Sequence, residues 1–119
     1  MRENGKVNIA LEACLGLQIV GGGIFEVQVD TGFNGWLTLP QSVVTEIGLP
    51  IIGRVESFLA GQTEPQETDV ASAQIKWLGE VRRVDVIVLD DYLIGTALLE
   101  GTQLTIDYAA QTVLIKSAL

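Results

Sequence analysis

Asp30 lies where a buried β-strand is expected to end. The run from Ile24 to Val29 alternates apolar and polar residues, which is typical of a strand with one buried face. The sequence contains no histidine, so Ser-His and Cys-His catalysis and His-ligated zinc are excluded within the chain. Proton transfer by a carboxylate survives this exclusion, and Asp30 is the candidate for it.

The other reactive residue types point to structure rather than chemistry. Cys14 is the only cysteine, so it cannot form an intramolecular disulfide, and its apolar neighbours predict a small buried hydrophobe. Asp90 and Asp91 are adjacent carboxylates, but consecutive residues at a strand end point apart, and Asp pairs are common in turns. We therefore predict a turn at this pair and expect neither a metal site nor a cofactor.

The segment from Val29 to Pro40 reads VDTGFNGWLTLP. An apolar strand that leads into Asp-Thr-Gly resembles the active-site loop of the retropepsin-like family of single-domain aspartic proteases. Phe33 departs from the small residue usual after this motif and is similar to a prokaryotic subgroup that carries Phe there. The resemblance implies that Asp30 is catalytic and that the active-site loop includes Thr31, Gly32 and Phe33.

A second segment strengthens the resemblance. The apolar run from Val86 to Leu89 is followed by Leu93, Ile94 and Gly95, which resembles the apolar-apolar-Gly signature that precedes a short C-terminal helix in this family. The resemblance implies that these three residues pack beneath the catalytic loop. The helix is expected from Thr96 to Glu100.

Composition and turn spacing indicate one small β-rich domain over residues 1–119. The sequence is 48% hydrophobic and contains 13 glycines and 3 prolines, and turn signals recur about every ten residues. Together with the resemblance, this predicts an all-β, single-domain retropepsin-like closed barrel with one short C-terminal helix and a flap hairpin. A further helical turn is expected from Pro40 to Ile47.

Alternating patterns predict where the strands lie. The stretch from Val7 to Val20 is interpreted as structure rather than a signal peptide, because polar residues interrupt it and Val7, Ile9 and Leu11 alternate as in a strand. The glycines at 21–23 predict a hairpin turn. Later strands are expected at Ile51 to Ala60, Thr68 to Trp77, Val84 to Val88, Gln103 to Tyr108 and Thr112 to Lys116.

The hairpin between the strands at 51–60 and 68–77 occupies the position of the family's substrate-covering flap. A hairpin of this kind can open for a peptide and then exclude water, and a plain surface hairpin is the alternative. Four acids and no base lie between Glu56 and Asp69, so the region is anionic. The residues assigned to the flap are Ala60, Gly61, Gln62 and Thr63.

Charge and hydropathy limit the expected partners. The net charge is −8, from 15 acidic and 7 basic residues, and Arg82-Arg83 is the only adjacent basic pair, so nucleic acid is not expected as a partner. No stretch is long and apolar enough to cross a membrane, and we expect no membrane partner. The single cysteine is compatible with a cytoplasmic location.

The resemblance implies an aspartic endopeptidase that acts on peptide or protein substrates. Its mechanism needs two carboxylates, and the chain contains one Asp-Thr-Gly, so a homodimer is expected in which water is activated between two copies of Asp30. The Thr31 hydroxyl would bond across the two-fold axis, and family members use terminal strands in the dimer interface. The alternative is a catalytically inactive peptide-binding or assembly module, because Phe33 could fill a substrate pocket.

Overall fold

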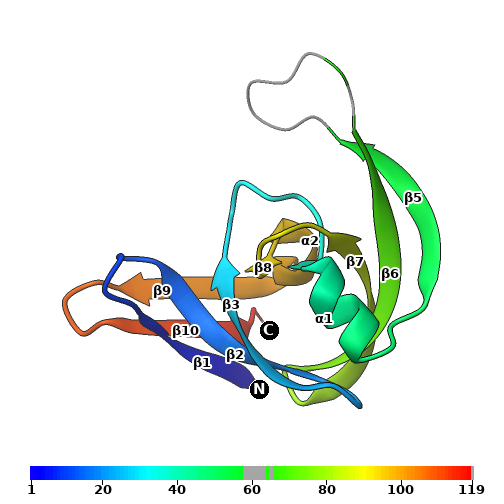
Figure 1. Ribbon diagram of the computed structural model, residues 1–119. Helices are drawn as coiled ribbons and strands as arrows, with labels where there is room; N and C mark the ends of the chain where they lie inside the picture. Colours follow the sequence, from blue (N-terminus) through cyan, green and yellow to red (C-terminus); the bar gives the residue numbers. More distant parts are fainter. Residues whose placement is uncertain (58–63, 65, 119) are drawn as a thin grey trace.

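Short strands dominate the part of the chain that the computed structural model describes, which comprises residues 1–57, 64 and 66–118 (Figure 1). The all-β prediction is confirmed. Two short helices, α1 (Gln41–Glu46) and α2 (Thr96–Leu99), interrupt the strands. The strands are β1 (Arg2–Val7), β2 (Ala13–Ile19), β3 (Gly23–Val29), β4 (Leu37–Leu39), β5 (Ile51–Ser57), β6 (Gln66–Trp77), β7 (Glu80–Val88), β8 (Leu93–Ile94), β9 (Thr102–Asp107) and β10 (Thr112–Ser117).

The strands pair in the order β5-β6-β7-β4-β8-β3-β2-β1-β10-β9. An additional antiparallel contact joins β2 to β6 through the pairs Gln18 with Lys76 and Ile19 with Ile75. Pairing therefore runs from β2 through β3, β8, β4, β7 and β6 and returns to β2, while β1, β10 and β9 extend the sheet beyond β2. Closure of a full barrel stays a prediction, since two residue pairs make this last contact.

Glycine geometry explains the first hairpin. Gly21 and Gly23 have φ angles of 78° and 94°, in the region that residues with a Cβ rarely adopt. They connect β2 to β3, which pair antiparallel from Ile19 opposite Gly23 to Cys14 opposite Gln28. The hairpin turn predicted at 21–23 is confirmed.

The strand predicted through Val7, Ile9 and Leu11 is wrong. β1 ends at Val7, and a turn leads from there to β2 at Ala13. The Asn8 side chain causes the turn, because its Oδ1 atom accepts hydrogen bonds from the backbone N–H groups of Ala10 and Glu12 at 3.0 and 2.9 Å. Val7 at the end of β1 is buried, whereas Ile9 and Leu11 in the turn are exposed, with Ile9 fully solvent-accessible.

Both helices lie where the sequence predicted them. α1 follows Pro40, buries Val43 and Val44, and is followed by Gly48 at a φ of 72°. α2 ends at Leu99 and thus one residue before the predicted end, and Gly101 beyond it has a φ of 77°. Its Leu98 is completely buried.

The core lies beneath the loop that follows β3. Its fully buried leucine and isoleucine side chains come from strands far apart in the sequence and from α2, and they form one apolar cluster. They are Leu17, Ile19, Leu37, Leu39, Ile75, Ile94, Leu98 and Ile115.

The two ends of the chain pair with each other. β1 and β10 are antiparallel, with Arg2 opposite Lys116 and Lys6 opposite Thr112. β10 also pairs with β9, and β1 with β2. Each of these two terminal strands thus has a strand neighbour on both sides.

Candidate active site

Asp30 follows the last residue of strand β3, whose apolar side chains are buried. Val27 and Val29 are buried and Asp30 is half-buried, so the carboxylate lies where the apolar face of the strand meets solvent. The Asp30 N–H donates to the Ile94 carbonyl at 2.9 Å. The backbone of the acidic residue is therefore tied to β8, the second segment singled out in the sequence.

The loop folds back on the carboxylate. Asp30 Oδ1 accepts the Gly32 N–H at 2.9 Å, and the Phe33 N–H donates to the Asp30 carbonyl at 3.1 Å. A Cβ at position 32 would lie 3.2 Å from Asp30 Oδ1, so glycine permits this close approach. Thr31 and Gly32 are exposed in the single chain.

Leu93, Ile94 and Gly95 lie directly against this loop. β8 is parallel to β3, with Val29 opposite Ile94, and antiparallel to β4, with Leu37 opposite Ile94. The N–H groups that follow β8 then donate to loop carbonyls: Gly95 to Trp36 at 3.2 Å, Thr96 to Phe33 at 2.8 Å and Ala97 to Gly35 at 3.2 Å. The structure thus brings together both segments that the sequence analysis had identified.

Phe33 packs within its own loop. A Cβ on Gly35 would meet the Phe33 ring, with Cε1 at 2.7 Å, and a Cβ on Gly95 would lie 2.6 Å from the ring atom Cδ2. The two glycines therefore provide the space that the half-buried ring occupies. This location explains how the loop accommodates a bulky aromatic after Asp-Thr-Gly.

Thr38 is a positioning residue that the sequence analysis missed. It is completely buried in β4, where its Oγ1 donates to the Asp91 carbonyl at 2.7 Å and accepts the Leu93 N–H at 2.9 Å. These two bonds fix the entry of the chain into β8. The sequence feature that could have identified Thr38 is its hydroxyl group between two leucines in an otherwise apolar strand.

Replacing Thr38 by valine should leave both partners unsatisfied without changing the volume of the side chain. We expect Thr38→Val to lower the free energy of unfolding by about 1 to 3 kcal/mol, measured by urea denaturation. Thr105→Val, at an exposed position of β9, is the matched control and should change it by less than about 0.5 kcal/mol. Equal effects of the two substitutions would contradict the assigned role.

A cation lies over the other end of the loop. The Arg82 guanidinium carbon is 4.5 Å from the centroid of the Trp36 ring, within the range of a cation–π contact. Arg82 comes from β7, and the Trp36 carbonyl accepts the Gly95 N–H. The contact therefore links β7 to the loop, and no feature of the linear sequence indicates it.

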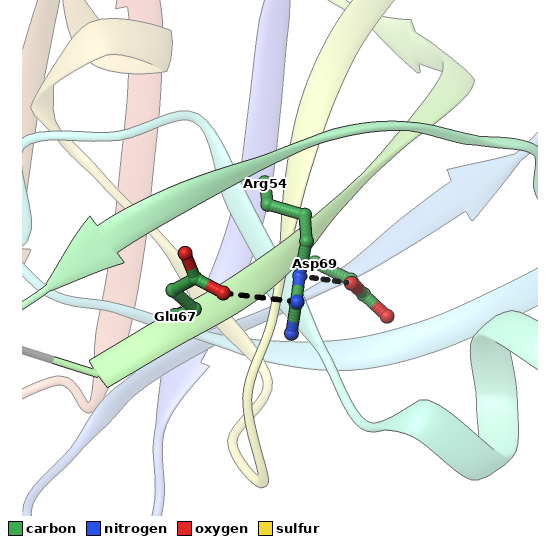
Figure 2. A network of polar contacts seen from close by, with 3 residues as sticks. All are labelled: Arg54, Glu67 and Asp69. Atoms are coloured by element: carbon green, nitrogen blue, oxygen red, sulfur yellow. Dashed lines mark hydrogen bonds and ion pairs between the residues drawn. The ribbon is translucent and has the colours of Figure 1, made fainter.

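The β5–β6 hairpin carries an ionic network (Figure 2). Arg54 bonds to Glu67 at 3.0 Å and to Asp69 at 3.1 Å, because the strand register places Arg54 opposite Asp69. Arg54 and Glu67 are largely exposed and Asp69 is half-buried, so solvent screens the pairs and they contribute little to stability. The network nevertheless changes the charge predicted for this hairpin, since Arg54 neutralises part of its acidic side. The proposed flap residues Ala60, Gly61, Gln62 and Thr63 lie outside the described residues.

An open cleft of about 500 Å³ lies beside this network. It runs from the β5–β6 hairpin to the segment after β7, and Asp30 does not line it. Asp90 and Asp91 form part of its wall and lie in an exposed bend between β7 and β8, where the sequence predicted a turn. The remaining lining residues are Gln41, Arg54, Gln66, Glu67, Thr68, Asp69, Val88 and Leu89.

Cys14 is buried, as predicted. Burial raises the pKa of its thiol, and the neighbouring carboxylates of Glu26 and Glu12 raise it further. The neutral thiol is a poor nucleophile, so this cysteine is a packing residue.

Within the described ranges, no group of three His, Cys, Asp or Glu side chains is placed to hold a metal ion. No helix in the part of the chain that the structure describes is long and apolar enough to span a membrane.

Known proteins share this architecture without close sequence similarity. No protein-family model matches the chain, and no curated protein sequence is significantly similar to it. The structure resembles a retropepsin-like aspartic protease from Rickettsia conorii with a TM-score of 0.73 and 16% identity, over 97% of this chain and 89% of that chain. It also resembles EIAV protease complexed with the inhibitor HBY-793, with a TM-score of 0.56 and 18% identity, over 78% of this chain and 89% of that chain.

The first of these matches extends over nearly the whole chain. One of the solved structures is a retropepsin-like aspartic protease and the other is a protease bound to an inhibitor, and this chain has the retropepsin-like fold.

Proposed function

We propose that the protein is an aspartic endopeptidase that hydrolyses peptide bonds as a homodimer. The observation that carries the proposal is Asp30 at the end of β3, with its carboxylate held by the Gly32 N–H and its backbone tied to Ile94. In a retropepsin-like fold, this arrangement places a carboxylate on a loop that is held by hydrogen bonds to β8. Rigid bracing matters because acid–base catalysis requires the carboxylate within hydrogen-bond reach of the reacting atoms.

Two copies of Asp30 supply the chemistry. Carboxylates about 3 Å apart cannot both ionise cheaply, so they share one proton. The ionised carboxylate takes a proton from water as the water oxygen attacks the scissile carbonyl, and the protonated one donates to the carbonyl oxygen. Collapse of the tetrahedral intermediate then breaks the C–N bond. The leaving nitrogen takes the proton that the first carboxylate accepted from water, and a hydroxyl of the intermediate returns its proton to the second carboxylate as the new carboxyl group forms. Because one chain contains a single Asp-Thr-Gly, the second acid comes from a second copy.

The Asp30 loop suits such a pairing. Thr31 and Gly32 are exposed in the single chain, so they are accessible to the same residues of a partner. A Thr31 hydroxyl that bonds across the two-fold axis would hold the two carboxylates at a constant separation. The β5–β6 hairpin would close over the bound peptide and limit the access of water.

The shared proton predicts a bell-shaped dependence of peptide cleavage on pH. Above the optimum both copies of Asp30 ionise and no acid remains, and below it both are protonated and no base remains. We expect kcat/KM, measured with a mixed peptide library and then with the best substrate found, to fall on both sides. Undiminished hydrolysis at strongly alkaline pH, or loss of hydrolysis on adding a chelator, would contradict the shared-proton mechanism.

A further inference from the structure

Two neighbouring turns expose apolar side chains at one end of the sheet. In the turn between β1 and β2, Ile9 is fully exposed and Leu11 is 67% exposed, and Tyr108 in the turn between β9 and β10 is 59% exposed. The Val7 N–H donates to the Gln111 carbonyl at 3.1 Å, which joins the two turns. Figure 1 shows them side by side, in blue and orange. We call Ile9, Leu11 and Tyr108 the turn patch.

The turn patch lies at the same end of the sheet as the Asp30 loop. β2 and β3 are antiparallel with Cys14 opposite Gln28, so the residues that precede Ala13 lie beside those that follow Val29. The β1–β2 turn is therefore adjacent to the start of the loop. A partner that covers Thr31 and Gly32 would meet this turn as well.

Leu11 has an unfavourable backbone conformation. Its φ angle is 63°, in the left-handed region that disfavours residues with a Cβ and that Gly or Asn adopts more easily. A leucine kept both exposed and strained is unfavourable for the isolated chain. The combination indicates that its side chain is used at the surface.

Strand pairing leaves β10 no free edge for a second copy. β10 pairs with β1 from Arg2 opposite Lys116 to Lys6 opposite Thr112, and with β9 along its whole length. β1 is joined to β2 only at Lys6 and Val7. A second copy that approaches the Asp30 loop from this end of the sheet meets the side chains of the two turns, and the turn patch supplies apolar ones.

We propose that the turn patch is the surface through which two copies of this chain associate, with the two-fold axis between their Asp30 loops. The inference rests on the proposed homodimeric function and names the residues that build it. A two-fold contact is self-complementary, so Ile9, Leu11 and Tyr108 of each copy meet the same apolar surface of the other. Each chain carries a net charge of −8, so the apolar contact opposes mutual repulsion and the dimer should tighten as salt is added.

Leu11→Asn tests the proposal, because asparagine tolerates the left-handed conformation and removes the apolar contact. Sedimentation equilibrium should show a dimer dissociation constant at least about tenfold higher than that of the unsubstituted protein. The urea midpoint, measured where both proteins are monomeric, should stay equal or rise because strain is relieved. A weaker dimer with an equal or higher urea midpoint distinguishes lost association from damaged folding.

Ile24→Asn is the matched control. Ile24 is 71% exposed and lies at the start of β3, at the end of the strand away from Asp30, so its substitution should leave dimerisation unchanged.

Three results would overturn the proposal. The first is an unsubstituted protein that is monomeric at all concentrations. The second is a triple variant, Ile9→Asn, Leu11→Asn and Tyr108→Asn, that dimerises as tightly as the unsubstituted protein. The third is separation of the dimer by Thr105→Lys in β9, which ends the strand order of the described residues. The same sedimentation experiment on the Asp30→Asn protein tests the interface separately from the peptidase function, because sedimentation measures association without any catalytic turnover. A Leu11-dependent dimer without peptidase activity would support this interface and refute the proposed function.

Discussion

Asp30→Asn is expected to abolish peptide cleavage and leave the fold intact. In the dimer the substitution removes both carboxylates, so no group remains to accept a proton from water, and we expect kcat/KM to fall by at least about a thousandfold. Asparagine has the same shape, and its Oδ1 can still accept the Gly32 N–H that bonds to Asp30 at 2.9 Å. Cleavage of the best library peptide measures the first effect, and thermal unfolding measures the second.

Glu46→Gln is the matched control for this experiment. It likewise replaces a carboxylate by an amide, at an exposed position of α1 that lies outside both the Asp30 loop and the cleft, and it should retain full activity. If folded Asp30→Asn protein hydrolysed peptides as fast as the unsubstituted protein, the catalytic assignment would be wrong. Equal losses in both variants would indicate a general electrostatic effect of removing negative charge instead of a specific role for Asp30.

Gly95→Ala should disrupt the site, because the added Cβ would overlap backbone atoms of the Asp30 loop. The added Cβ would lie 2.5 Å from the Phe33 carbonyl oxygen and would also overlap the Gly35 carbonyl oxygen. Both oxygens are held in place, because they accept the N–H groups of Thr96 and Ala97. We therefore expect a loss of at least about 3 kcal/mol in the free energy of unfolding, or failure to fold. Any folded fraction should lose peptidase activity, because the loop that holds Asp30 must shift.

Gly53→Ala provides the comparison, since a Cβ at this position of β5 meets no atom of the described residues within 4 Å. Alanine there should be neutral or slightly stabilising, because it reduces the conformational freedom of the unfolded chain. Urea denaturation of both variants separates the contact effect from the general effect of replacing a glycine. A Gly95→Ala protein as stable and active as Gly53→Ala would show that β8 does not brace the loop.

The components of the candidate site were predictable where local chemistry decides the structure. Asp30 follows a strand because Val27 and Val29 alternate with polar residues, and the pattern alone indicates that the strand ends there. The glycines at 21–23 and the residues around α1 follow local rules of turns and helix ends in the same way. The turn at Asn8 was missed because a side-chain hydrogen bond overrides an apolar alternation that is typical of a strand.

Contacts between distant segments could not be derived from the pattern. Thr38 reads as one polar residue in a short strand, and its role emerges only when Asp91 and Leu93 lie beside it. Arg82 belongs to the one basic pair of the sequence, yet its ring partner is Trp36. Arg54 neutralises Glu67 and Asp69 only because of the β5–β6 register.

The sequence by itself determined the chemistry that remains possible and the order of the elements. The absence of histidine excluded Ser-His and Cys-His catalysis and left a carboxylate mechanism possible, and alternation with glycine punctuation set most strand and helix positions. Only the tertiary structure decided how β8 braces the Asp30 loop, how Phe33 fits between two glycines, and that the terminal strands pair with each other. The reason is physical: periodicity reports which face of an element is buried, whereas register and packing partners depend on the burial of all elements together.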